Sequence, residues 1–433
     1  MPHSRSQKIP ITGRFLNIKK ILALGGLAAT LVATVYAAEP IAIAARPLTE
    51  AESVQLALAR PAVQALDEAR LALARSDVAV AGRWSNPQFQ YSREEVDRAG
   101  GDMTDEFFWL SQRLEISGQR GLRKRAAEQR VGAAGLATDA ERIAIETDAR
   151  TRFYQALHQQ ARARAIVDWI ARMTATEAII RKRQAAGEVS GYDAVRLSTE
   201  RVSAQASLRQ ARARFARLWA ELSAVLGGER VVAPYDGVAG RLLPEAPAPL
   251  ADLLASLNAR PDIARLESEA AAHELDRRAD ARSWVPELTL GVGHKLIDDD
   301  LGRDSGPMVS AGISIPLFDR GQPEQQRAAA NTAIARSEFE LALATAEGEV
   351  RGRWLELNEL IATAHSQQEE ARVDAKRLVE IAEAAYRGGE LGVLELLDAY
   401  RGAHEAELLA LRIATLARHA RIELDRLTGG PEL

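Results

Sequence analysis

The chain has 433 residues, with 56 Lys and Arg against 60 Asp and Glu, and a formal net charge of −4. This near balance excludes the basic footprint of a nucleic-acid-binding protein. The absence of cysteine excludes disulfides and lipid attachment through a thiol, and the scarcity of aromatic residues, at 5%, favours long helices over one thick globular core.

Residues 1–37 have the pattern of a secretory signal peptide. Basic residues up to Lys20 precede an apolar run over 21–35, which ends in Val35-Tyr36-Ala37, a sequence that suits signal peptidase. A membrane anchor is the alternative, but the run is shorter than the roughly 20 residues of a spanning helix. No later segment qualifies as a membrane helix, so any insertion into a membrane is expected to use strands.

The rest of the sequence contains an internal repeat. Ala59-Arg60-Pro61 recurs as Ala259-Arg260-Pro261 at an offset of 200 residues, and Gly187-Glu188-Val189 corresponds to Gly389-Glu390-Leu391 at an offset of 202. Such self-similarity predicts a tandem duplication. Its expected parts are a first repeat over 38–228, a linker over 229–258, a second repeat over 259–430 and a tail over 431–433.

Each repeat begins with a helix, over 61–82 or 261–283, that starts at a proline. A predicted β-hairpin follows it, formed by 88–96 with 107–116 in the first repeat and by 287–296 with 308–317 in the second. Polar loops are expected to join the strands, over 97–105 and 298–307. One face of the second hairpin is apolar: Leu288, Leu290, Val292, Val309, Ala311, Ile313 and Ile315.

Strands of this length and alternation suit a bilayer, with lipid on one side and water on the other. A half-buried hairpin in a soluble domain is the alternative. Four strands do not close a barrel, and open edges in hydrocarbon leave backbone groups unsatisfied. The chain is therefore expected to assemble from several copies. Two copies reach the minimum of eight strands and three supply twelve, so the strand number alone does not choose between them.

A long helix follows each hairpin. No proline lies between Pro87 and Pro234 or between Pro323 and Pro431, which predicts helices over 123–186 and 324–387. Each would extend roughly 96 Å. Glycine turns then lead into return helices over 192–226 and 394–427. The proline-containing linker over 229–258 is expected to form a small belt at mid-height.

This order of elements, given twice after a signal peptide, resembles the TolC-like outer-membrane efflux protein family over essentially the whole mature chain. The segments Leu110–Arg120 and Ile313–Gly321 are similar to that family's strand-to-helix signatures. The resemblance implies a mainly α fold with a membrane β-barrel portion. Duplicated helical hairpins would form a trimeric α-barrel, and four strands per chain would contribute to a shared 12-stranded barrel.

The resemblance further implies an exit duct in outer-membrane lipid with a long periplasmic portion. Its homotrimer would dock through a periplasmic adaptor (membrane fusion) protein onto an inner-membrane pump of the resistance-nodulation-division (RND) class. The first repeat is most similar to CzcC-like proteins of the cation-efflux branch, which implies heavy-metal cations as cargo. A type I protein-secretion channel and a non-conducting periplasmic coiled-coil adaptor are the alternatives.

No motif for catalysis or for a cofactor occurs in the sequence, so neither is expected. The histidines lack the spacing of paired metal ligands. We therefore predict no metal site, and we expect the histidines on predicted helices to be solvated surface residues: His158, His273, His365, His404 and His419.

Glu395 and Asp398 are three residues apart and therefore share one helix face. Taken alone, they are an ordinary solvated acidic pair. In the family, acids at this distance from the turn glycine, here Gly389, line the periplasmic aperture. Three copies would set six carboxylates around one axis, and such a ring favours cations.

The resemblance also assigns contacts that close the aperture. Asp193 and Tyr386 fall where the family places a tyrosine-to-acid hydrogen bond; a tyrosine packed on its own helix is the alternative. The chain departs from the family at Leu391, where a basic residue is usual, and Arg387 is the candidate replacement. The adaptor-facing tips are expected at five glycines: Gly187, Gly191, Gly388, Gly389 and Gly392.

Overall fold

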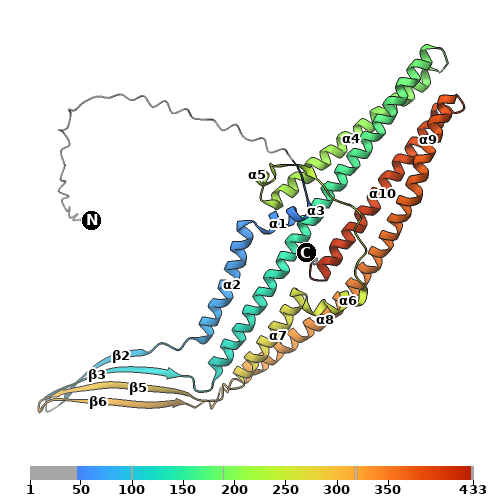
Figure 1. Ribbon diagram of the computed structural model, residues 1–433. Coiled ribbons are helices and arrows are strands. Elements are labelled where there is room, and N and C mark those ends of the chain that lie inside the picture. The colour runs from blue at the N-terminus through green and yellow to red at the C-terminus, as the bar shows by residue number, and fades with distance from the viewer. Residues whose placement is uncertain (1–45, 99–100, 189, 316, 319, 431–433) are drawn as a thin grey trace, which may run out of the picture. The chain divides into compact units, whose positions relative to one another are not determined.

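The computed structural model describes residues 46–98, 101–188, 190–315, 317–318 and 320–430. The predicted signal peptide and the predicted tail at 431–433 therefore lie outside the described residues. The described chain is mainly helical and contains two similar sets of elements (Figure 1). Long helices lie side by side, and the four long strands extend from one end of them.

The described chain begins with a short strand and helix that were not predicted from the sequence. β1 (Arg46–Leu48) pairs in parallel with β4 (Tyr235–Val238), and α1 (Glu50–Leu58) follows β1. The Thr49 hydroxyl accepts from the backbone N–H of Glu52 at 3.4 Å, and the Glu52 carboxylate accepts from the backbone N–H of Thr49 at 3.0 Å. This reciprocal capping box has a Thr-x-x-Glu pattern that is visible in the sequence.

The first set of elements contains one uninterrupted helix, α3, of 67 residues, which is about 100 Å long. The first helix of the set covers the predicted residues, and the long helix starts four residues earlier than predicted. The elements in order are α2 (Pro61–Gly82), β2 (Gln88–Arg98), β3 (Gly101–Leu114), α3 (Gln119–Ala185) and α4 (Gly191–Leu226). The connecting segment holds α5 (Glu229–Val232), β4, α6 (Leu250–Ala255) and the 3-10 helix η1 (Leu257–Ala259).

The second set follows the same order, but its long helical segment is divided. A π-helical turn interrupts the predicted single helix, and the segment as a whole covers 322–388, the same length as α3. The elements in order are α7 (Pro261–Asp280), β5 (Glu287–Asp299), β6 (Gly302–Ser314), α8 (Gln322–Ser366), the π turn η2 (Gln367–Ala371), α9 (Arg372–Gly388) and α10 (Val393–Leu427).

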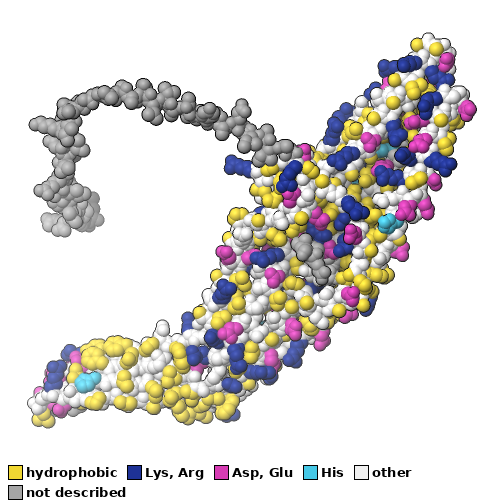
Figure 2. Space-filling model, viewed as in Figure 1, with side chains coloured by type: hydrophobic (Ala, Val, Ile, Leu, Met, Phe, Trp, Pro, Cys, Tyr) yellow, Lys and Arg dark blue, Asp and Glu magenta, His cyan; other side chains and the backbone are white. Residues whose placement is uncertain are grey.

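The four long strands form one antiparallel sheet in the order β2-β3-β5-β6. Leu110 lies opposite Phe89 on one side and Val292 on the other, and Val292 lies opposite Val309. The predicted apolar face is therefore confirmed, and it continues across all four strands. Eight of its large side chains are more than a third exposed: Phe89, Tyr91, Phe108, Leu110, Leu290, Val292, Val309 and Ile313. Figure 2 shows this apolar surface on the strands.

The predicted polar loops between the strands were wrong. Pairing continues until Arg98 faces Gly101, and until Asp299 faces Gly302. A strand ladder is held by backbone groups, so polar side chains do not end it, and opposite charges on neighbouring strands stabilise it. One such pair is formed by Lys295 and Asp105, whose Nζ and Oδ2 atoms lie 2.7 Å apart. Asp105 belongs to the first predicted loop, and Lys295 lies just before the second.

The helix α3 is the centre of the helical packing. It lies against α2 and α4 of its own repeat and against α7 and α10 of the other. Where α1, α3, α4 and α10 meet, the core combines large side chains such as Phe153 and Leu222 with small ones such as Ala149. Alanine allows close approach of helices, so a core only a few side chains thick still excludes water.

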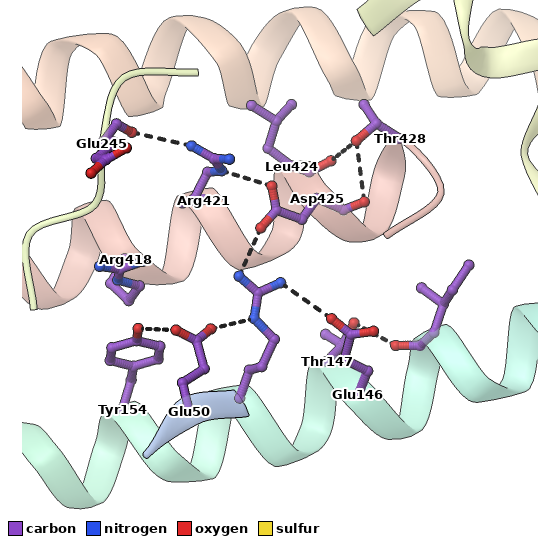
Figure 3. A network of polar contacts seen from close by, with 12 residues as sticks. Glu50, Glu146, Thr147, Tyr154, Glu245, Arg418, Arg421, Leu424, Asp425 and Thr428 are labelled. Atoms are coloured by element: carbon purple, nitrogen blue, oxygen red, sulfur yellow. Dashed lines mark hydrogen bonds and ion pairs between the residues drawn. The ribbon is translucent and has the colours of Figure 1, made fainter. Parts of the chain in front are cut away.

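A buried ionic network joins the two repeats near this core (Figure 3). The guanidinium of Arg150 on α3 is 8% exposed and donates to Glu50 Oε1 at 2.7 Å and to Asp425 Oδ2 at 2.8 Å. Glu146 Oε1 lies 3.7 Å from the same guanidinium. Burial raises the pKa of the Glu146 carboxyl. One cation thus holds α1, α3 and α10 together through carboxylates from all three.

The network also reaches the connecting segment. Arg421 on α10 donates to Asp425 Oδ1 at 2.7 Å and to the backbone carbonyl of Glu245 at 3.2 Å. Arg418 donates to the carbonyls of Leu242 and Leu243, and its guanidinium lies 4.5 Å from the centre of the Tyr154 ring. The connecting segment is therefore fastened to α10 mainly through its backbone.

We predict that Arg150→Met lowers the free energy of unfolding by about 3 kcal/mol, because it leaves the buried Glu146 without its cation and Asp425 with Arg421 alone. Arg152→Met is the control on the same helix, since Arg152 is one third exposed and pairs with the more exposed Asp148 at i−4 and, at 3.9 Å, with Glu221. It is expected to cost less than about 1 kcal/mol. Denaturant unfolding in detergent, followed by far-UV circular dichroism, measures both. Equal effects of the two changes would contradict the role of the network.

Candidate functional site

Two tight turns end the long helical segments at the end remote from the sheet (Figure 1). Gly187 and Gly389 have φ values of 77° and 80°. After each, the next residue donates its N–H back into the helix: Glu188 to the Arg183 carbonyl and Glu390 to the Ala385 carbonyl, both at 2.9 Å. Both turns are therefore Schellman motifs, in which glycine takes the left-handed position. We call these two turns the tips.

The other three predicted tip glycines have different backbone roles. Gly191 is the first residue of α4, and Gly388 is the last residue of α9. Gly392 precedes α10 in an extended conformation with φ of −84°. All five glycines thus lie at the tips, although only Gly187 and Gly389 among them require the left-handed region. Contact with an adaptor stays a prediction.

Glu395 and Asp398 lie exposed on the first turns of α10. Leu396 and Leu397 beside them are buried in a hydrophobic cluster near the tips, which we call the tip core and which also contains Ile180, Leu197 and Tyr386. Packing of the two leucines therefore turns the two acids outward. Neither acid forms an ion pair with any described residue. This arrangement leaves both carboxylates available to solvent or to other subunits. Their place in a pore ring stays a prediction.

Tyr386 packs into the tip core and is 3% exposed. Its hydroxyl has no hydrogen-bond partner among the described residues. Burial raises the pKa of Tyr386, and the nearby Asp193 carboxylate adds to that rise while Arg183 opposes it. Asp193 itself accepts from the Ser190 hydroxyl at 3.5 Å. The two predicted partners are therefore neighbours without the predicted bond in the single chain.

Arg183 is a tip residue that the sequence did not single out. It lies in the last turn of α3, yet its Nη1 donates to the backbone carbonyl of Tyr386 at 2.9 Å. Its Nε donates to Glu188 Oε2 at 3.1 Å within its own tip. Arginine in a last helical turn is common, because it suits the negative end of the helix dipole. Its position in the sequence therefore did not indicate a contact with the second tip.

The candidate replacement for the missing base does not link the tips in the single chain. Arg387 donates through Nε to the Glu383 carbonyl at 3.1 Å, on its own helix. Leu391 packs against the tip core, where Tyr386 and Leu396 are buried. Leu391 thus adds to the apolar packing of the tip core, whereas a charged side chain at this position would point into that core.

Three histidines contradict the prediction that they are solvated, because His158, His404 and His419 are partly buried. His158 Nδ1 lies 2.8 Å from the Thr415 hydroxyl, and the ring of His404 stacks on Trp169 with centroids 4.3 Å apart. Burial lowers the pKa of all three histidines. Packing of α3 on α10 creates these contacts between residues far apart in the sequence. Among the described residues, no group of three or more His, Cys, Asp or Glu is arranged to hold a metal ion.

Comparison with known proteins connects these features to a family. The outer membrane efflux protein family matches residues 254–430. The cobalt-zinc-cadmium resistance protein CzcC of Cupriavidus metallidurans is 26% identical over 330 residues, which cover 73% of this chain and 75% of that protein. The nickel-cobalt-cadmium resistance protein NccC of Alcaligenes xylosoxydans xylosoxydans is 26% identical over 307 residues, or 66% of this chain and 65% of that protein.

The second repeat thus matches the outer membrane efflux protein family. The fold agrees: the outer membrane protein VceC of Vibrio cholerae superposes with a TM-score of 0.71 at 18% identity, covering 88% of this chain and 96% of that one. The predicted CzcC-like resemblance is thus confirmed. Within the described residues, none of the helices is both long and apolar enough to span a membrane.

We predict that neighbouring glycines of the second tip respond oppositely to alanine. Gly389→Ala should lower the free energy of unfolding by about 1 kcal/mol, because an L-residue is strained at φ of 80°. Gly388→Ala should leave it unchanged or raise it by up to about 1 kcal/mol, since Gly388 is helical and nothing lies within 3.8 Å of an added Cβ. Chemical denaturation of both variants measures the difference, and equal midpoints would be inconsistent with the tip geometry.

Proposed function

We propose that this efflux-family protein is the outer-membrane exit duct of a tripartite efflux system. The observation that carries the proposal is the sheet of four long strands, whose apolar face is uncovered in the single chain. An uncovered apolar face of this extent calls for lipid or a partner. The long helices would continue the duct into the periplasm.

The edges of the sheet support assembly from several chains. β2 and β6 each pair with only one neighbour in the four-stranded sheet. An unpaired edge in hydrocarbon costs several kcal/mol for each unsatisfied backbone group. Joining β6 of one chain to β2 of the next removes both edges, and we propose a homotrimer with a shared barrel of twelve strands. The glycines Gly291 and Gly293 under the Trp109 ring suit the opposite, water-facing side of that wall.

We propose heavy-metal cations as cargo. The support is the likeness to proteins named for cobalt, zinc, cadmium and nickel resistance, together with the free carboxylates of Glu395 and Asp398. In a trimer these acids would form the aperture ring, which concentrates cations without holding them tightly. The duct would receive this cargo from an RND-type inner-membrane pump through a periplasmic adaptor that meets the tips. Asp193 and Tyr386 would close the aperture, with the Tyr386 hydroxyl gaining its missing partner on assembly.

A non-conducting adaptor is the less well supported reading. Such an adaptor would lie in water, where a sheet that exposes eight large apolar side chains on one face is unfavourable. Protein secretion would use the same architecture, and the names of the metal-resistance relatives favour cations over that cargo.

The proposed duct is expected to fractionate with the outer membrane as a detergent-stable trimer and to conduct ions in planar bilayers. Chemical cross-linking counts the subunits, and single-channel recording detects the current. A monomer that stays soluble without detergent and carries no current would refute the proposal.

The double variant Glu395→Gln/Asp398→Asn is expected to lose cation selectivity and block by multivalent cations, because it removes six carboxylates from the proposed ring. Reversal potentials in a salt gradient measure the selectivity. The matched control is Asp374→Asn/Glu380→Gln, which removes as many charges from exposed positions on α9. The same loss in both double variants, or in neither, would count against the ring.

A further inference from the structure

The two tips share a backbone conformation but differ in their side chains. The repeat offset of 202 residues places Arg183 at the position of Ala385 and Gln184 at the position of Tyr386. The Schellman hydrogen bonds are the same in both tips. After the duplication, therefore, one tip carries a long cation where the other carries a methyl group, and one carries an aromatic ring where the other carries an amide.

These divergent residues meet each other. The Arg183 guanidinium donates to the Tyr386 carbonyl at 2.9 Å, and its carbon lies 5.6 Å from the centre of the Tyr386 ring. Its Nη2 would lie 3.5 Å from a Cβ placed on Gly389, so the guanidinium also lies against the backbone of the second tip. With its bond to Glu188, Arg183 contacts both tips at once.

The electrostatics of this contact suit arginine. The side chain belongs to the last turn of α3 and reaches the last turn of α9, so one cation serves the negative ends of two helix dipoles. The planar guanidinium donates in two directions at once, toward Glu188 and toward Tyr386, whereas an ammonium group is a point charge with weaker directional preference. The Arg183 side chain is 26% exposed, so water screens the contact less than it screens an open surface pair.

We propose that Arg183 is the positioning residue that fastens the two tips of one chain together, in place of the base that is missing at Leu391. This inference rests on the proposed duct, since a fastened pair of tips narrows the aperture there. It assigns the role to α3 of the first repeat rather than to Arg387, whose Nε bonds only its own helix. Loss of the fastener frees the second tip to move outward with Tyr386.

The test compares Arg183→Met, Arg183→Lys and Arg387→Met with Lys182→Met as the control. Lys182 is an exposed cation on the same helical turn whose side chain forms no hydrogen bond or ion pair with the described residues. The first measurement is single-channel conductance of the trimer. The second is the distance between spin labels at Ala186→Cys and Gly388→Cys within one chain, measured in trimers diluted with unlabelled subunits. The chain has no native cysteine, so labelling is specific.

We expect Arg183→Met to raise the current several-fold and to broaden the distance distribution toward longer values. Arg183→Lys should rescue part of both effects, and Lys182→Met should match the parent chain. Unchanged current and distances in a trimeric Arg183→Met variant would overturn the inference, as would a larger effect of Arg387→Met. A parent trimer that carries no current would instead defeat the proposed duct, while the spin-label distances would still test the fastener.

Discussion

The arrangement of the two repeats depends on a guanidinium buried among carboxylates that come from three helices. Removing Arg150 and its partners from water is costly, and the contacts offset that cost only while Glu50, Glu146 and Asp425 stay in place. Such a network tolerates one relative position of α1, α3 and α10 much better than others. It therefore acts mainly on specificity, whereas apolar packing of α3 against its neighbours supplies most of the stabilisation.

The chain has two copies of most backbone elements, and the copies differ in their side chains. Both tips close with a left-handed glycine, and both long helical segments have the same length. The side chains that meet between the tips are not shared by the repeats, since Arg183 corresponds to Ala385. The contact between Arg183 and the second tip is therefore asymmetric. Two identical repeats would form such a contact in both directions or in neither.

Apolar surface is distributed unusually in this protein. The helical part buries mostly alanine and leucine in thin cores, whereas the sheet leaves large aromatic and branched side chains exposed. Thin cores suit walls, because each helix needs only one or two buried faces. The exposed sheet suits an apolar medium, in which burying apolar side chains brings no gain in free energy. These two surfaces are what the proposed duct requires, with lipid around the sheet and water around the helices.

The sequence by itself determined the duplication, the long helices, the apolar face of the hairpins and the places of the glycine turns, because each follows from local periodicity or from backbone preferences of proline and glycine. It also supplied the family. The strand ends predicted from the sequence were wrong, because backbone pairing overrides side-chain polarity there. The helix α1 was not predicted, although Thr49 and Glu52 have the sequence pattern of a capping box. Only the tertiary structure decided which side chains meet: Arg150 finds partners 100 and 275 residues away, and Arg183 reaches a carbonyl 203 residues along the chain. Long-range partners are set by how helices pack side by side, and no local pattern of residues encodes that packing.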